Sequence, residues 1–79
     1  MKHEVDYGAI GNRIRHLRTD RNLTQEEFGE MVGLEPNYIS RIEKAKSKLG
    51  LVAAARISMN TEVSVDFLLF GKESADMRE

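Results

Sequence analysis

The sequence predicts an all-α fold of five short helices, and three observations support this prediction. Apolar residues recur at helical spacing, complete helix-start and helix-stop signals punctuate the chain, and no strand is predicted. The length of 79 residues, of which 41% are hydrophobic and 32% charged, is typical of one small globular domain. We divide the chain into an N-terminal segment at 1–9, a domain at 10–71 and a polar tail at 72–79.

The first helix is expected over about 7–21, with Asp6 as its N-terminal cap. Apolar residues at i, i+4 and i+7 form its inward stripe: Ile10, Ile14 and Leu17.

The second helix has the strongest start signal in the chain. Thr24 is a capping residue, and Glu27 stands three positions later, which completes a capping box. Leu23 and Phe28 are spaced so that they can pack on each other across the cap as a hydrophobic staple.

A short turn separates the second helix from the third. Gly33 can adopt the left-handed conformation that ends a helix. Pro36 fits the first position of the next helix, where its missing N–H has no cost. Two helices joined by a three-residue turn that contains glycine are typical of a helix-turn-helix unit.

Two further helices complete the predicted fold. The fourth is expected over about 51–60 and the fifth over 65–70. Ser64 caps the fifth helix, and Gly71 ends it.

The formal net charge of −1 argues weakly against bulk nucleic-acid binding, but the charges are unevenly distributed. Residues 13–21 contain four arginines and one acid, and residues 36–48 contain four basic residues and one acid. Solvated helix surfaces would also explain these charges.

The chain has no cysteine, hence no disulfide, and no apolar run of about 18 residues, so we expect a cytoplasmic protein that does not enter membranes.

Taken together, the domain at 10–71 resembles the DNA-binding domain of phage repressor and Cro-type regulators, also called the xenobiotic-response-element family. The segments that carry the resemblance are IGNRIRHLRTDRNLTQEEFGEMVGLEPNYISRIE and VSVDFLLFG. The resemblance implies a compact five-helix domain that binds specific double-stranded DNA and regulates transcription. It also implies that the third helix lies in the major groove and that the second crosses the phosphate backbone.

The resemblance assigns contacts to individual residues. Those implied to touch bases are Pro36, Asn37, Ser40 and Arg41. Those implied to touch phosphates are Gln25, Tyr38, Lys44, Lys46 and Lys48, although the Tyr38 ring can instead pack beside the turn. Asparagine can pair bidentately with adenine and arginine with guanine, whereas proline offers only an apolar contact.

Arg18 and Glu43 are charged residues on the inward faces of the first and third helices. A charge on an apolar face needs a partner. These positions match a buried Arg–Glu pair of the phage repressors, so we expect an ion pair that fixes the third helix against the first.

The segment KAKSKLG at 44–50 departs from the family pattern. Family members commonly end the third helix with glycine at the position of Ala45. Two alternatives follow: the third helix runs one turn longer, or the loop takes another path through Gly50.

A homodimer on a near-palindromic operator is expected, because Phe67 or Phe70 should be left partly exposed on the fifth helix, where the resembling repressors pair.

At this length, regulation would come through protein level, dimerisation or a separate protein regulator. The operator, the genes controlled and the choice between repressor and activator stay open, as do phage, mobile-element, restriction–modification and antitoxin contexts. The alternative function is a protein-interaction module, including an antitoxin-type partner.

The sequence contains no constellation that supports catalysis, so we do not expect an enzyme. Two separate histidines, His3 and His16, do not make a metal site without cysteine. No metal or other cofactor is expected.

Overall fold

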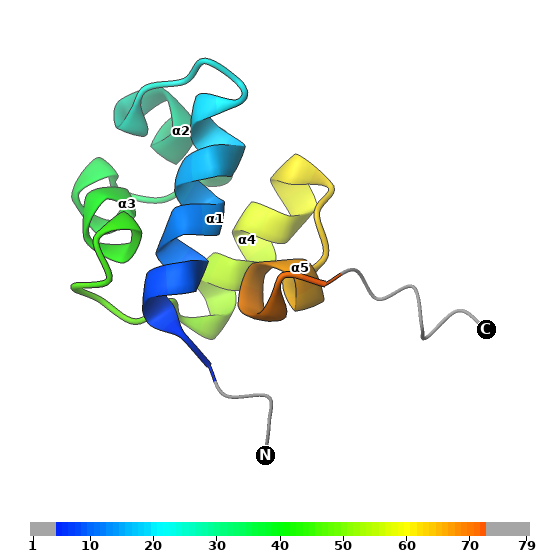
Figure 1. The fold of residues 1–79 in the computed structure, drawn as a ribbon. Helices are drawn as coiled ribbons and strands as arrows, with labels where there is room; N and C mark the ends of the chain where they lie inside the picture. Colours follow the sequence, from blue (N-terminus) through cyan, green and yellow to red (C-terminus); the bar gives the residue numbers. More distant parts are fainter. Residues whose placement is uncertain (1–4, 73–79) are drawn as a thin grey trace.

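The computed structural model describes residues 5–72, which form five helices and no strand (Figure 1). The helices are α1 (Tyr7–Thr19), α2 (Gln25–Val32), α3 (Pro36–Glu43), α4 (Leu51–Thr61) and α5 (Val65–Phe70). In Figure 1, α1 runs through the middle of the molecule, with α3 on one side and α4 and α5 on the other. Residues 1–4 and 73–79, which include most of the predicted tail, lie outside the described residues. Over 5–72, no helix is long and apolar enough to cross a bilayer.

The predicted local signals at the helix starts are confirmed. The Asp6 carboxylate accepts hydrogen bonds from the N–H groups of Gly8 and Ala9, at 3.0 and 3.1 Å. Thr24 and Glu27 form the complete capping box, in which each side chain accepts from the other residue's backbone N–H. These bonds satisfy backbone donors that a helix start otherwise leaves free. The starts of α1 and α2 are therefore set by their own residues.

Helix α1 ends two residues earlier than predicted. The chain turns after Thr19, and Asn22 adopts a left-handed conformation with φ 58°. The N–H of Leu23 then donates to the carbonyl of Arg18 at 3.2 Å. Asparagine tolerates this conformation better than most residues. The turn at Asn22 therefore ends α1 and leads the chain into Leu23, just before α2.

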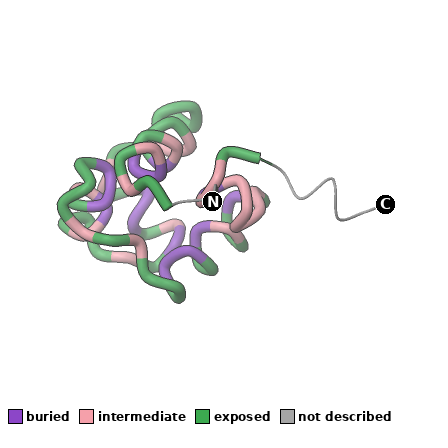
Figure 2. The backbone as a smooth tube through the Cα atoms, turned by 60° about the horizontal axis from the view of Figure 1, so that its bottom comes forward, coloured by how far each residue is buried: buried purple, intermediate pink, exposed green. Residues whose placement is uncertain are grey.

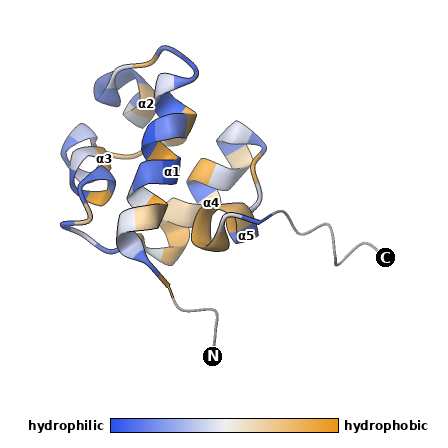
Figure 3. Cartoon of the chain, viewed as in Figure 1, coloured by the Kyte–Doolittle hydropathy of each residue, from blue (hydrophilic) through white to orange (hydrophobic). Residues whose placement is uncertain are grey.

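One hydrophobic core joins all five helices (Figure 2). Its fully buried members are Ile10, Ile14, Phe28, Val32, Ile39, Ile42, Ile57 and Leu68. Ile10 and Ile14 of the predicted α1 stripe and both isoleucines of α3 belong to this set, whereas Leu17 is partly buried and packs against it. Figure 3 shows that α5 is the most continuously apolar helix, and only Leu68 of α5 is fully buried.

Two glycines allow backbone segments to approach closely. A Cβ atom on Gly11 of α1 would lie 2.8 Å from the carbonyl oxygen of Glu43 and would also clash with that of Ile42. A Cβ atom on Gly29 of α2 would clash with the carbonyl oxygen of Leu34. Glycine is unfavourable inside helices, and here it is explained by packing. The two contacts bring α3 and the preceding turn against α1 and α2.

The ion pair expected between Arg18 and Glu43 is present and joins α1 to α3. The Arg18 Nε donates to Glu43 Oε2 at 2.7 Å, and Nη2 donates to Oε1 at 2.9 Å. The Glu43 side chain is only 3% exposed and that of Arg18 is 15% exposed. The hydrogen bond to Glu43 raises the pKa of the Arg18 guanidinium above its usual value, against the opposing effect of desolvation.

Two more groups complete the surroundings of this pair. Arg18 Nη1 donates to the carbonyl of Leu23 at 3.0 Å, and Gln25 Nε2 donates to Glu43 Oε1 at 3.1 Å. The carboxylate therefore binds groups from α1 and α2, while itself belonging to α3. Both charges are satisfied by fixed hydrogen bonds, as a buried pair requires.

Other arginines of the basic segment at 13–21 also serve the fold. Arg13 Nη1 donates to the carbonyl of Leu68 in α5 at 2.8 Å. Arg21 donates to the carbonyls of Leu17 and Thr61, at 2.9 and 3.2 Å. Cations near the last carbonyls of a helix are favourable. Arg13, Arg18 and Arg21 therefore each bind another part of the fold, although Arg15 and Arg21 remain exposed.

We expect Glu43→Ala to lower the free energy of unfolding by about 3–5 kcal/mol, because it leaves the Arg18 charge buried without its partner. Denaturant unfolding of Glu43→Ala, Arg18→Ala and the double variant measures the coupling between the two side chains. If the effects of the single variants simply add, the pair does not stabilise the fold as described.

We expect Gly11→Ala to destabilise the domain by about 1–3 kcal/mol, because the new methyl group would overpack against rigid backbone of α3. Gly8→Ala is the matched control on the same helix, where a Cβ atom would lie no nearer than 3.4 Å to another residue. The control should be neutral or stabilising by up to about 1 kcal/mol. Equal unfolding midpoints for the two variants would contradict the close approach of α1 and α3.

Candidate nucleic-acid interface

The outward face of α3 carries the residues predicted to contact bases. Asn37, Arg41 and Lys44 are exposed and follow each other at i, i+4 and i+7, so they share one face of the helix. Ser40 lies half-buried at the edge of this face, and Pro36 is exposed at the first helical position. Ile39, Ile42 and Glu43 point the other way and are buried. The core residues and the ion pair therefore present the polar face to solvent.

Helix α3 ends at Glu43 and does not run one turn longer, so the loop takes the other path that the sequence left open. The N–H of Ala45 donates to the carbonyl of Ile42, and that of Lys46 to the carbonyl of Arg41, at 3.1 and 2.8 Å. These two bonds form a Schellman motif. Ala45 occupies the left-handed position with φ 60°, where glycine is usual and where another residue costs about 1–2 kcal/mol. The helix stops without its usual stop residue.

Tyr38 holds the loop that follows α3. Its half-buried ring packs against the core. Its hydroxyl donates to the carbonyl of Lys48 at 3.2 Å and accepts from the N–H of Gly50 at 3.0 Å. A phosphate contact by Tyr38 stays a prediction, and it would require the hydroxyl proton to leave Lys48.

Basic side chains cluster along α3 and its following loop. Arg41, Lys44, Lys46 and Lys48 are all exposed. Of these four side chains, Arg41 also makes a hydrogen bond to another side chain: its Nε donates to Ser47 Oγ at 2.9 Å. This cluster therefore forms a positive surface beside the outward face of α3.

Gln25 stands at the first position of α2, and its side chain is half-buried. One N–H of its amide already binds Glu43. The primary amide has a second N–H, so a phosphate contact remains compatible with this arrangement and stays a prediction.

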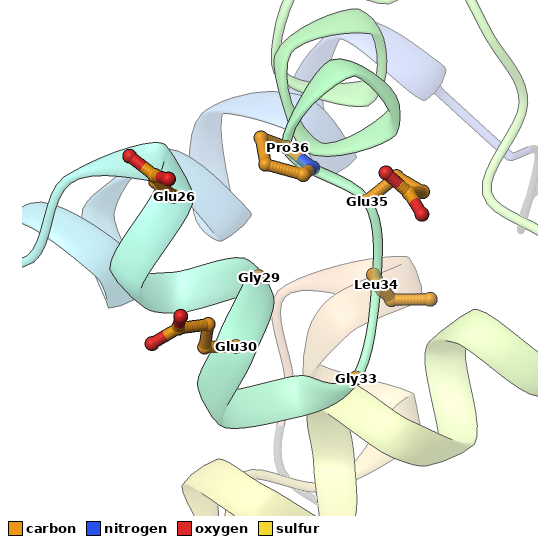
Figure 4. A pocket seen from close by; sticks show the side chains of 7 residues that line it. All are labelled: Glu26, Gly29, Glu30, Gly33, Leu34, Glu35 and Pro36. Carbon is orange, nitrogen blue, oxygen red and sulfur yellow. The ribbon is translucent and has the colours of Figure 1, made fainter.

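An acidic hollow of about 380 Å³ lies beside the turn between α2 and α3 (Figure 4). Glu26 and Glu30 of α2 and Glu35 of the turn surround it, and Gly29, Gly33, Leu34 and Pro36 complete its lining. Its negative charge borders the start of α3, so the surface near Pro36 is electrostatically mixed.

The largest exposed apolar side chains were not predicted from the sequence. Leu51, Val52 and Met59 are 85%, 66% and 73% exposed and lie on α4. Together with exposed Ala55 they form one stripe opposite the buried face of the helix, which we call the α4 stripe. The predicted interface residues Phe67 and Phe70 are only half-exposed. The spacing of Leu51 and Met59 by eight residues was a signal available in the sequence.

The described residues offer no obvious metal site. No group of three or more histidine, cysteine, aspartate or glutamate side chains within 5–72 is arranged to hold a metal ion.

Comparison with known proteins places this geometry in a family. A family model described as helix-turn-helix matches residues 14–68. The chain is 31% identical over 70 residues to the HTH-type transcriptional activator BcrR of Enterococcus faecalis, a match that covers 89% of this chain and 34% of BcrR. It is 32% identical over 76 residues to the HTH-type transcriptional regulator RamB of Mycobacterium tuberculosis, covering 89% of this chain and 15% of RamB. The chain therefore spans about a third or less of the length of these relatives.

Solved structures agree with this assignment. The P22 c2 repressor in complex with a synthetic operator matches with a TM-score of 0.74 and 30% identity, covering 80% of this chain and 96% of the repressor chain. The restriction–modification controller protein C.AhdI from Aeromonas hydrophila also matches with a TM-score of 0.74, at 26% identity, covering 81% of this chain and 97% of C.AhdI. This chain therefore belongs to the helix-turn-helix family, in the group of the phage repressor and Cro-type regulators.

Proposed function

We propose that this protein binds a specific double-stranded DNA operator through α3 and regulates transcription. The observation that carries the proposal is the outward face of α3, where exposed Asn37 and Arg41 stand one helical turn apart on a helix fixed by a buried ion pair. An α-helix of this kind fits the major groove, where each base pair presents a distinct pattern of donors and acceptors. The match to a repressor solved with its operator supports the same reading.

Each residue of the face has a distinct role in this proposal. Asn37 would pair with adenine, and Arg41 would donate two hydrogen bonds to guanine O6 and N7. Pro36 would make an apolar contact, such as one with a thymine methyl group, and Ser40 would contact a flanking base. These contacts supply specificity, whereas phosphate contacts supply most of the affinity.

The charges beside α3 orient the DNA. Lys44, Lys46 and Lys48 would contact phosphates on one side of the groove, and Gln25 and Tyr38 would contribute further phosphate contacts. The acidic hollow would repel phosphates. DNA is therefore expected to follow the basic side of α3 and to avoid the carboxylates of Glu26, Glu30 and Glu35.

We also propose that two copies bind together as a homodimer on a near-palindromic operator. A two-fold dimer would place two copies of α3 about 34 Å apart along one face of the DNA. The exposed α4 stripe and the half-exposed Phe67 and Phe70 are the apolar surfaces available for pairing, since apolar patches of this kind mark interaction sites. A separate protein regulator would act on this assembly, which works in the cytoplasm.

We expect Arg41→Ala to lose the preference for guanine at one base step, while Lys44→Ala weakens binding to all sequences about equally. Selection from random DNA with the wild-type protein and both variants measures this difference. Lys44→Ala should also reduce the slope of log affinity against log salt by about one.

The same selection tests the proposal as a whole. If the wild-type protein enriches no motif, and its binding partners prove to be proteins, the protein-interaction module is the correct function. A motif that Arg41→Ala leaves unchanged would remove Arg41 from the reading face.

We expect Leu51→Glu and Met59→Glu to shift the protein from dimer to monomer, because each places a charge inside the apolar contact. Asn60→Glu is the matched control: it adds the same charge at an exposed position of α4 outside the stripe. Sedimentation equilibrium with and without operator DNA measures the oligomeric state. A wild-type protein that stays monomeric in both conditions would contradict the dimer. If Phe67→Ala shifts the protein to monomer and the α4 variants do not, the dimer interface lies on α5.

A further inference from the structure

Ser47 lies within hydrogen-bond distance of the residue proposed to read guanine. The Arg41 Nε donates to Ser47 Oγ at 2.9 Å, across six positions of the chain. Arg41 lies on α3, whereas Ser47 lies in the loop that follows it. The contact therefore links the reading helix to the segment KAKSKLG, which departs from the family pattern.

The loop holds Ser47 in place from both sides. Before it, the Schellman motif with left-handed Ala45 turns the chain back toward α3. After it, the Tyr38 hydroxyl binds both the carbonyl of Lys48 and the N–H of Gly50. Ser47 is itself half-buried, so its hydroxyl is presented from a backbone with fixed ends.

We propose that Ser47 is a positioning residue that orients the Arg41 guanidinium for end-on recognition of guanine. This inference rests on the proposed function. An arginine has five N–H donors in a planar fork, one on Nε and two on each Nη. With Nε bound to Ser47, both Nη atoms remain available, and their parallel N–H groups match guanine O6 and N7.

The contact also has an energetic consequence. An arginine side chain has many rotamers, and holding it for recognition costs conformational entropy. The bond to Ser47 restricts the side chain before DNA arrives, so less entropy is lost on binding. It also removes the alternative in which Nε pairs with the base. Ser47 thus affects which base is preferred without touching DNA itself.

The test compares Ser47→Ala with the conservative variant Ser47→Thr, using the operator that the wild-type protein selects. Affinities are measured for the four operators that differ only at the base pair whose preference Arg41→Ala loses. We expect Ser47→Ala to reduce the preference for guanine there by about 2- to 10-fold, the range for one net hydrogen bond. Ser47→Thr keeps a hydroxyl and should retain most of the preference.

Two further readouts separate positioning from a general structural or phosphate-binding role. Ser47→Ala should leave both the salt dependence of binding and the thermal midpoint unchanged. Equal weakening on all four operators, or an unchanged preference for guanine, would overturn the role of Ser47. If the wild-type protein itself shows no preference that depends on Arg41, the proposed base reading fails first, which distinguishes the two failures.

Tyr38→Phe provides an independent arm, because it removes the hydroxyl that holds the loop but keeps the ring. We expect it to lower the guanine preference at the same base pair, by releasing Ser47. An unchanged guanine preference, with a uniform loss of affinity and a smaller salt slope, would assign Tyr38 to a phosphate contact alone and would overturn the proposed support of Ser47 by the loop.

Discussion

The buried ion pair between Arg18 and Glu43 determines where α3 sits, and the proposed interface depends on it. Glu43 accepts two hydrogen bonds from Arg18 of α1 and one from Gln25 of α2. A single carboxylate on α3 therefore joins α1, α2 and α3. Hydrogen bonds of this kind are directional, whereas apolar packing alone tolerates small rotations. The pair thus fixes the rotation of α3 about its axis, and with it the direction in which Asn37 and Arg41 point.

This arrangement explains how a protein with a net charge of −1 can present a basic surface. Arg18 of α1 binds Glu43, Arg13 of α1 binds a backbone carbonyl of α5, and Arg21, which follows α1, binds the last carbonyl of α4. The exposed cations of 41–48 form a positive surface next to the outward face of α3, and the three carboxylates of the acidic hollow lie beside the turn. Local charge, rather than net charge, would direct the approach of DNA.

Helix starts and the turn were predictable from the sequence, because each depends on nearby residues. Thr24 with Glu27 shows this for the capping box. The helical period places Arg18 and Glu43 on inward faces, and their pairing was expected from the resemblance to the phage repressors. What the sequence did not predict depends on the approach of distant segments. Ala45 adopts a left-handed conformation that its residue type disfavours, and the bonds of Tyr38 and Ser47 exist only because the loop folds back. The α4 stripe had a visible spacing, but its exposure depends on which side of α4 meets the core.

The central claim is that the outward face of α3 meets the base edges of DNA. Amide chemical shifts of the isotope-labelled protein, recorded during titration with the operator obtained by selection, test it most directly. The account predicts that the large shifts fall on Asn37 and Arg41, on the loop that follows α3 and on the start of α2, while α4 changes little beyond any effect of pairing. Large shifts confined to the acidic hollow or to the α4 stripe, with α3 unaffected, would contradict the account.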